Sequence, residues 1–358
     1  MAVYISKKTM KKTIDLRSDT TTLQSHNVIH AISNATVGDF AYGEDKSCND
    51  LSEYCKKLFK VEEALFVTSG MLANRLAIAS QTSPGDELIT HYNYHVNFFD
   101  SAGNAKVNNI VFNCIRNSSG ILDVNEVEYA INSKPRYKIF AQVSLVSIEN
   151  SINGFNGKIY PFEKQVELYN FLKAYNINLH LDGARIFNAH VETNISLADY
   201  AKHVDTMSFS FTKGLGAPFG SMLMGKREII EKAKKLQVWL GSGYHQIGYY
   251  ANAAKYVLQN NVSRLKEDNE LAKLFADKIK EIPYIKLILP YPETNIVSFS
   301  IKELNVTNEV FLSQCQAYGL LLFPWLESHI RAVIHLGIEK ADIVNAAEII
   351  KEVVLNLV

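Results

Sequence analysis

Short apolar segments alternate with amphipathic segments through the middle of this 358-residue chain. Each apolar segment has the length of a buried strand, and the apolar residues between them recur at the spacing of one helix face. Such alternation is typical of α/β proteins, in which helices cover both faces of a mostly parallel sheet. In that fold class, ligands bind beyond the carboxyl ends of the strands. The expected strands are 64–67, 87–90, 110–112, 139–148, 178–182 and 206–211, and the expected helices include a stretch from Met71, 124–131 and 162–175.

The pattern changes towards the C-terminus, where helices are followed by shorter strands. Two helical stretches, 251–259 and 270–282, precede segments in the order strand, strand, helix, strand, strand, helix. This order predicts a small α+β domain. We therefore expect a large domain at 1–282, which includes an N-terminal arm at 1–30, and a small C-terminal domain at 283–358. The expected elements of the small domain are 285–289, 295–301, 308–317, 319–323, 331–335 and 341–355.

The composition excludes several classes of partner. Lysine and arginine number 37, as do aspartate and glutamate, so no overall charge attracts nucleic acid or an anionic membrane. The four cysteines form no Cys-x-x-Cys pair and the ten histidines show no zinc-binding spacing, so we expect neither a disulfide framework nor a metal site. The basic segment at 1–12 has no apolar core of signal-peptide length, and no apolar run approaches the roughly 18 residues of a membrane helix. We expect a cytoplasmic protein.

Two charged residues stand at the ends of apolar strands. Lys213 follows 207–211, and Asp182 ends the strand at 178–182. Burying either charge is costly unless a partner compensates it. A pair of this kind suits pyridoxal phosphate, because the lysine can carry the cofactor as a Schiff base while the aspartate keeps its ring nitrogen protonated. The alternatives are a lysine that reaches solvent and a salt bridge between Asp182 and Arg185.

Three other places suit the same site. Ser69 and Gly70 lie between a strand and a helix, where backbone N–H groups can bind an anion such as phosphate. His95 follows the strand at 87–90 and can stack on a flat ring or act as a base. Arg331 heads an apolar strand and can bind an amino-acid carboxylate. Each also has an ordinary structural interpretation: a glycine turn, a loop histidine and an arginine at a sheet edge.

Longer segments around these residues share their order with one protein family. The segments are Ile14–Thr20, Val37–Asp39, Tyr42–Asp45, Leu65–Gly70, Ala73–Asn74, Pro84–Glu87, Glu149–Asn150, Leu179–Ala189, Lys213–Pro218 and Ile330–Val333. Together they resemble the threonine aldolases, which are fold type I enzymes of the pyridoxal-phosphate-dependent, transferase-like class. The resemblance covers about residues 14–355. It implies the same α/β fold with a small C-terminal domain.

The resemblance implies a carbon–carbon lyase of amino-acid metabolism. The expected reaction is the pyridoxal-phosphate-dependent cleavage of a β-hydroxy-α-amino acid, such as threonine or allo-threonine, to glycine and an aldehyde. The expected assembly is a dimer-based homo-oligomer, a homotetramer, with active sites at a subunit interface. The alternatives are another reaction on this cofactor, such as β-elimination, transaldolase-type transfer or racemisation, and a non-catalytic homologue that binds the cofactor.

The resemblance also implies a role for each site residue. Lys213 and His95 are the expected catalytic residues. The expected cofactor-binding residues are Ser69, Gly70, Met71, His95, Asp182, Arg185, Lys213 and His245. The expected substrate-binding residues are Ser18, Tyr42, Arg185 and Arg331, of which Tyr42 comes from the partner subunit.

Four residues depart from the family pattern near the expected site. Met71 stands where a threonine is usual after Ser-Gly, and Ile152 stands where a histidine is usual. Ile139 occupies a position at which some members have a histidine, and His245 replaces a common arginine near the phosphate. Neutral sequence drift and a change in substrate preference are both consistent with these four differences. We expect them to affect cofactor affinity and the handling of the β-hydroxyl group.

Overall fold

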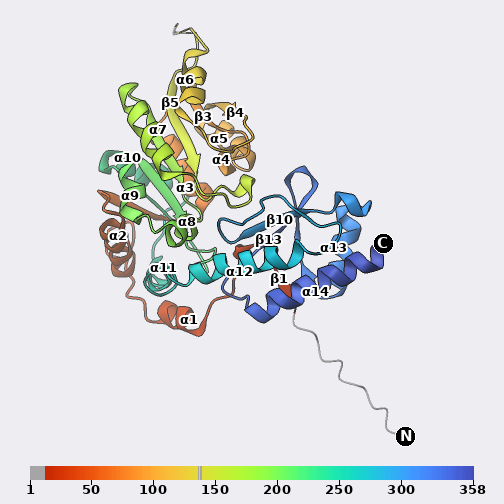
Figure 1. Ribbon diagram of the computed structural model, residues 1–358. Helices are drawn as coiled ribbons and strands as arrows, with labels where there is room; N and C mark the ends of the chain where they lie inside the picture. The colour runs from red at the N-terminus through yellow and green to blue at the C-terminus, as the bar shows by residue number, and fades with distance from the viewer. Residues whose placement is uncertain (1–12, 136, 138) are drawn as a thin grey trace.

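The computed structural model describes residues 13–135, 137 and 139–358. The basic segment noted at 1–12, and with it the first part of the predicted arm, therefore lies outside the described residues. Figure 1 shows a larger part, built around a central sheet, beside a smaller C-terminal part. None of the helices in the described ranges combines the length and the apolar character that crossing a membrane requires.

A seven-stranded sheet forms the centre of the larger part. β8 runs antiparallel to both of its neighbours, β2 and β7, and the other adjacent strands are parallel. The predicted mostly parallel sheet is therefore confirmed. Across the sheet, the strands are β2 (Glu63–Val67), β8 (Ser221–Gly225), β7 (Thr206–Ser210), β6 (Asn178–Asp182), β5 (Val143–Glu149), β3 (Glu87–His91) and β4 (Val111–Ile115).

Helices cover both faces of this sheet, as predicted. Because neighbouring side chains of a strand point to opposite faces, Leu65 and Val67 of β2 pack with α3 and α10. Ala64 and Phe66 join the main core on the other face. The helices of this part are α1 (His26–Ser33), α2 (Lys46–Phe59), α3 (Gly70–Ala79), α4 (His95–Phe98), α5 (Ser101–Asn108), α6 (Val124–Asn132), α7 (Phe162–Ala174), α8 (Ile186–Thr193), α9 (Leu197–Lys202), α10 (Arg227–Trp239), α11 (Gly248–Asn260) and α12 (Leu265–Ile279).

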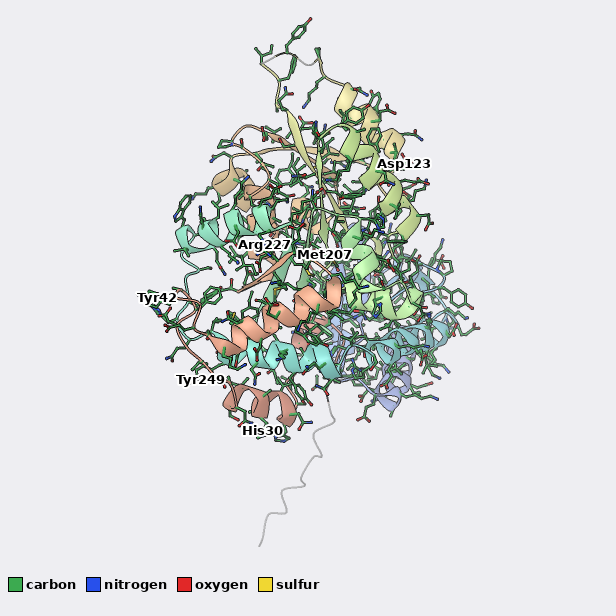
Figure 2. All side chains as sticks on the ribbon, turned by 90° about the vertical axis from the view of Figure 1, so that its left-hand side faces the viewer. His30, Tyr42, Asp123, Met207, Arg227 and Tyr249 are labelled. Atoms are coloured by element: carbon green, nitrogen blue, oxygen red, sulfur yellow. The ribbon has the colours of Figure 1, made fainter. Side chains whose placement is uncertain are left out.

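Local side-chain caps fix where several helices begin. The Asp123 side chain (labelled in Figure 2) accepts a hydrogen bond from the backbone N of Glu126. In return, the Glu126 side chain accepts from the backbone N of Asp123, and this capping box marks the start of α6. Ser69 caps α3 in a similar way by accepting from Leu72 N. Both helix starts lie within two residues of the predicted positions.

The smaller part combines a segment from the start of the described residues with the C-terminal segments. Its four-stranded antiparallel sheet has the order β12 (Phe323–Trp325), β13 (His329–Val333), β10 (Ile296–Ser300) and β9 (Lys286–Leu287). α13 (Asn308–Ala317) and α14 (Lys340–Leu357) accompany this sheet, and β1 (Ile14–Asp15) pairs with β11 (Leu320–Leu321). Ile14 and Leu16 share one apolar cluster with Phe275 of α12 and Phe299 of β10. The boundary predicted near 282 follows α12 and stays a prediction.

Two predicted strands differ from the observed ones. The strand predicted at 139–148 begins only at Val143, and Ile139 lies in a loop with 86% of its surface exposed. The strand predicted at 319–323 is divided into β11 and β12, which belong to different sheets. In both places the sequence is apolar, but the structure does not bury the whole segment in one sheet.

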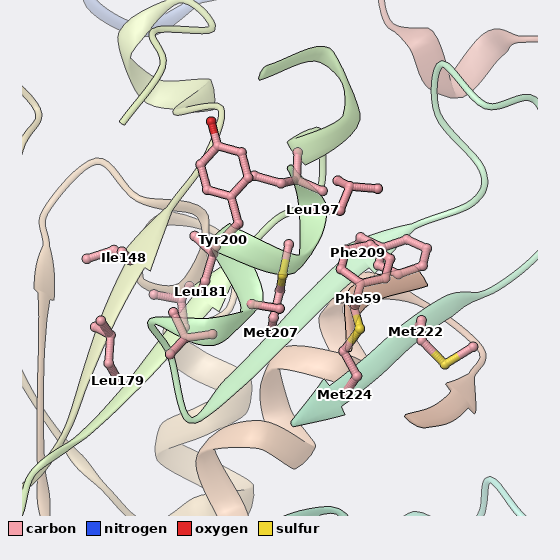
Figure 3. Packing of buried hydrophobic residues seen from close by; sticks show 14 of the residues in the cluster. Phe59, Ile148, Leu179, Leu181, Leu197, Tyr200, Met207, Phe209, Met222 and Met224 are labelled. Carbon is pink, nitrogen blue, oxygen red and sulfur yellow. The ribbon is translucent and has the colours of Figure 1, made fainter. Parts of the chain in front are cut away.

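We predict that Phe209→Ala lowers the free energy of unfolding by about 3–5 kcal/mol, because it removes a large buried ring from a packed core. The Phe209 ring stacks on Phe59 with centroids 5.3 Å apart (Figure 3). It also meets Phe187 and Phe211 edge-on. Urea denaturation followed by circular dichroism measures the change. The control is Tyr129→Ala, at an exposed side chain, which should change stability by at most about 0.5 kcal/mol. Equal losses in the two variants would contradict the prediction.

Candidate active site

A pocket lies at the carboxyl ends of β2, β6 and β7, beside the first turn of α3. This is the edge at which ligands bind in α/β folds. Six of the predicted site residues meet here, although they are far apart in sequence. The lining residues are Thr68, Ser69, Gly70, Met71, Asn74, His95, Asp182, Ala184, Ser210, Thr212 and Lys213.

Asp182 presents a buried carboxylate to this pocket. It accepts hydrogen bonds from Asn74 Nδ2 at 2.7 Å and from Ala184 N at 3.0 Å. The Asn74 amide is itself oriented, because its Oδ1 accepts from Ser208 Oγ at 2.8 Å and lies 3.1 Å from His180 Nε2. Burial alone would raise the pKa of Asp182, but the nearby positive charges and the Asn74 hydrogen bond outweigh it and lower the pKa. The carboxylate therefore stays charged and suits a cationic ligand group.

Lys213 is partly buried just beyond β7, on the wall of the pocket. Burial and the positive charge of Arg185 lower the pKa of Lys213 to about 8, although Asp19 and Asp182 act in the opposite direction. About one tenth of the amine is therefore neutral at pH 7, far more than for an ordinary lysine. A neutral lysine amine in a pocket is a nucleophile for a carbonyl carbon.

Arg185 pairs with Asp19 and not with Asp182, which was the alternative salt bridge considered from the sequence. Its Nε and Nη2 each lie 2.7 Å from a carboxylate oxygen of Asp19, and both side chains are buried. Burial alone would raise the pKa of Asp19, but the Arg185 charge lowers it to about 2. Arg185 Nη1 also lies 3.4 Å from Asn153 Oδ1. This arginine is thus held in place by protein groups.

Arg331 of β13 is a buried arginine with no carboxylate partner among the described residues. Its Nη1 donates to Asn153 Oδ1 at 3.0 Å, and its Nη2 contacts the Arg17 carbonyl oxygen at 3.4 Å. The guanidinium lies over the Trp325 ring, with 3.7 Å between its carbon and the ring centroid. Burial and the charge of Arg185 lower the pKa of Arg331 to about 9. A buried guanidinium in this position suits an anionic ligand group.

His95 begins α4 and brings its ring to the pocket. Its Nδ1 lies 3.4 Å from Asp100 Oδ2, and its backbone N donates to Glu149 Oε2 at 2.6 Å. Burial alone would lower the pKa of His95, but Asp100 and Asp182 outweigh it and raise the pKa. Burial and the neighbouring Asp182 also raise the pKa of Glu149 to about 7. The site therefore contains two neighbouring acid–base groups whose pKa values are both raised.

Other predicted residues lie outside this pocket. Tyr42 is 81% exposed at the outer edge of the molecule (Figure 2), and the His245 side chain is 84% exposed. His245 Nδ1 lies 2.8 Å from Asp39 Oδ2, which ties these two segments together. Ser18 stays near Asp19, where its hydroxyl group accepts from Thr20 N at 3.2 Å. Neither Tyr42 nor His245 lines the pocket of its own chain.

The four departures from the family pattern occupy different surroundings. Met71 lines the pocket and is 45% exposed. Ile152 is fully buried in the main core, whereas Ile139 faces solvent. His245 lies on the exposed surface described above. Among these four, only Met71 lines the described pocket, so only Met71 can contact a ligand bound there.

Several residues that shape the site were not singled out from the sequence. Asp19, Asn74 and Glu149 lie within the segments that carry the family resemblance, so the motifs contained a signal for them. Asn153 and Asp100 had none, because their contacts depend on chain segments that meet only in the folded protein.

Within the described part of the chain, no group of three or more His, Cys, Asp or Glu side chains could hold a metal ion.

A model of the beta-eliminating lyase family matches residues 15–302. The chain belongs to this family. Among its curated relatives, low-specificity L-threonine aldolase 1 of Arabidopsis thaliana is 30% identical over 335 residues, covering 93% of this chain and 94% of the relative. Low specificity L-threonine aldolase of Escherichia coli K12 is 38% identical over 269 residues, covering 75% of this chain and 79% of the relative. Both relatives are threonine aldolases, the group that the sequence motifs indicated.

Solved structures of threonine aldolases have the same fold as this chain. A threonine aldolase structure from Leishmania major has a TM-score of 0.82 at 18% identity, covering 95% of this chain and 99% of that chain. A putative L-allo-threonine aldolase from Listeria monocytogenes has a TM-score of 0.78 at 18% identity, covering 97% of both chains. The predicted fold class, threonine aldolase resemblance and lyase class are confirmed.

We predict that Lys213 in the ligand-free protein titrates near pH 8, because burial and the Arg185 charge lower its pKa to about 8. Trace acetylation, which modifies only neutral amines, can be followed for each lysine by peptide mass spectrometry. Half-maximal labelling of Lys213 should occur near pH 8, with the exposed lysines of the same digest as the reference. In Arg185→Gln the loss of a positive neighbour should move the midpoint to higher pH. A Lys213 midpoint equal to that of the exposed lysines would contradict the prediction.

Proposed function

We propose that this protein is a pyridoxal-phosphate-dependent aldolase that cleaves a β-hydroxy-α-amino acid, such as threonine or allo-threonine, to glycine and an aldehyde. The observation that carries the proposal is the meeting of Lys213, with its lowered pKa, and the charged Asp182 in one pocket at the start of a helix. The relatives named low-specificity L-threonine aldolases support this choice of reaction.

The pocket fits the proposed cofactor in three respects. The Lys213 amine is available to bind the carbonyl carbon, and the Asp182 carboxylate suits a protonated ring nitrogen. The first turn of α3, with Ser69 and Gly70 on the pocket lining, suits a phosphate group because the first N–H groups of a helix have no partner within the helix. When bound, pyridoxal phosphate would supply the electron sink that stabilises negative charge at the substrate Cα.

The substrate carboxylate would bind at Arg331. This guanidinium is fixed by Asn153 and by stacking on Trp325, yet it has no carboxylate partner among the described residues. Ser18 lies next to Arg17, whose carbonyl oxygen accepts from Arg331, so Ser18 belongs to the same region. A carboxylate held here would orient the amino acid relative to Lys213.

His95 is the group that we assign to the β-hydroxyl proton. Its ring lines the pocket, and Asp100 orients it from outside. Loss of that proton is coupled to release of the aldehyde, so a base at this point determines whether the Cα–Cβ bond breaks. Glu149, which accepts from the His95 backbone N and has a pKa raised to about 7, is a second acid–base group beside it.

The deciding experiment incubates the purified protein with pyridoxal phosphate and then with L-threonine or L-allo-threonine, and measures acetaldehyde. We expect aldehyde release together with visible absorbance from the bound cofactor. Lys213→Ala should lose both, and Lys202→Ala, at an exposed lysine, should keep both. Arg331→Leu should keep the absorbance but raise the KM for the amino acid about tenfold or more, as expected for a lost charged hydrogen bond.

Other outcomes of this assay identify the alternatives. Absorbance that shifts with amino acids but yields no aldehyde would favour β-elimination, transaldolase-type transfer or racemisation. Absorbance that does not respond to amino acids would favour a non-catalytic protein. Full activity in Lys213→Ala would contradict the proposed site.

We also propose a dimer-based homo-oligomer, a tetramer, in which Tyr42 and His245 act in the partner's pocket. Both are exposed, and neither lines the pocket of its own chain. Further exposed apolar residues lie at the end of α10 and the start of α11. A group of exposed apolar residues often marks a protein–protein interface. They are Val238, Trp239, Leu240, Tyr249 and Tyr250.

Mixed oligomers test this arrangement. Lys213→Ala and Tyr42→Ala subunits should each be weakly active or inactive alone, because every site lacks one group. Co-expression of the two should restore about one quarter of wild-type activity, since half of the dimers are mixed and each has one intact site. Mixed dimers without recovered activity would show that Tyr42 does not act across the interface. Co-expression of Lys213→Ala with Arg331→Leu, whose residues lie in one chain's site, is the control and tests whether recovery requires the interface.

A further inference from the structure

Ser221 is a buried serine that the protein itself leaves without a partner. It is 1% exposed, and its Oγ has no hydrogen-bond partner among the described residues. Most buried hydroxyl groups in folded proteins are hydrogen-bonded, because leaving one unpaired costs about 1–3 kcal/mol. An unpaired hydroxyl beside a ligand pocket therefore points to a group that arrives with the ligand.

The position of Ser221 follows from the reversed direction of β8. Because β8 is antiparallel to its neighbours, its first residue lies at the sheet edge where β2 and β7 end. Ser221 pairs there with Val67 and with Ser210. Ser210 lines the pocket, and Val67 is followed by the pocket residue Thr68. Ser221 thus lies beside the site, on a strand that the sequence pattern did not predict.

The Ser221 side chain faces the start of α3. Leu223, two residues later on the same strand face, packs in the cluster that contains α3 residues. A Cβ atom placed on Gly70, the first residue of α3, would lie 3.8 Å from Ser221 Oγ, and this oxygen is the nearest non-neighbouring atom to that point. The hydroxyl group and the helix start therefore border the same small space.

Two backbone N–H groups at the start of α3 have no hydrogen-bond acceptor within the helix. Leu72 N donates to Ser69 Oγ at 3.2 Å, and Ala73 N donates to Ser69 O at 3.0 Å. The N–H groups of Gly70 and Met71 belong to the first turn, so they have no partner within the helix. Ser69 Oγ accepts as the helix cap, which leaves its O–H free to donate, whereas Met71 has no hydroxyl group. An anion at this point therefore has two backbone donors and the Ser69 hydroxyl group, but no hydroxyl group from residue 71.

We infer that Ser221 is a further phosphate-binding residue, whose Oγ–H donates to a phosphate oxygen seated on the first turn of α3. It supplies from β8 the hydroxyl group that Met71 does not supply from the helix. The inference rests on the proposed cofactor and adds to it a residue that the motifs did not indicate. The same hydroxyl group would not contact pyridoxal, which has the ring and the aldehyde but no phosphate.

The comparison of these two ligands gives the test. Cofactor-free wild-type and Ser221→Ala proteins are titrated with pyridoxal phosphate and with pyridoxal, and binding is followed by absorbance and by protein fluorescence. Ser221→Ala should bind pyridoxal phosphate about tenfold or more weakly, the range of one hydrogen bond to a charged group, and should bind pyridoxal unchanged. The matched control is Ser147→Ala, at another buried serine with an unpaired Oγ, which lies in β5 outside the pocket. It should leave both affinities unchanged.

The thermal stability of the cofactor-free proteins provides a second measurement. Removing an unpaired buried hydroxyl should leave Ser221→Ala at least as stable as wild type, so a weaker affinity for the cofactor would not reflect misfolding. Equal affinity of wild type and Ser221→Ala for pyridoxal phosphate would overturn the inference, as would an equal loss for both ligands. If wild-type protein binds neither ligand, the proposed function itself fails, and that result is distinct from a failure confined to Ser221→Ala.

Discussion

Two buried side chains of opposite charge, Arg185 and Asp19, connect the two parts of the molecule. Arg185 lies just before α8 in the larger part, whereas Asp19 follows the N-terminal segment that packs in the smaller part. Two hydrogen bonds of 2.7 Å join the guanidinium and the carboxylate. Removing one member of such a pair typically costs about 3–5 kcal/mol, because the other charge is left buried and alone. The geometry of the whole candidate site depends on this contact.

The same ion pair determines how the other charges behave. Because Asp19 satisfies Arg185, the carboxylate of Asp182 is not used by an arginine and remains available at the pocket wall. The positive charge of Arg185 then lowers the pKa of both Lys213 and Arg331. For the lysine, this favours the neutral nucleophile. For Arg331, the carboxylate that we propose to bind there would relieve the repulsion. One arginine thus influences two neighbouring groups through its charge.

The sequence predicted the parts of the site that depend on local pattern. Asp182 and Lys213 could be found because each is a charge at the end of an apolar strand, and the helix start at Gly70 follows a strand directly. β8 was missed because Ser221–Gly225 is a very short apolar run next to glycines, and periodicity alone does not distinguish such a run from a buried helical or loop segment. The contacts of Asn153 join segments that only the fold brings together. The cross-subunit placement of Tyr42 came from family resemblance, since no local pattern encodes it.

The pairing of β1 with β11 has a consequence for how the protein is made. Ile14 and Leu320 are neighbours in this short sheet although about 300 residues separate them along the chain. The apolar cluster beneath them also contains residues of α14, the last helix. During synthesis, the N-terminal segment therefore lacks its full docking surface until nearly the whole chain has left the ribosome. Asp19, a few residues after β1, can form its buried ion pair with Arg185 in its final setting only then, so a chain truncated before α14 would lack the surface that holds this pair in place.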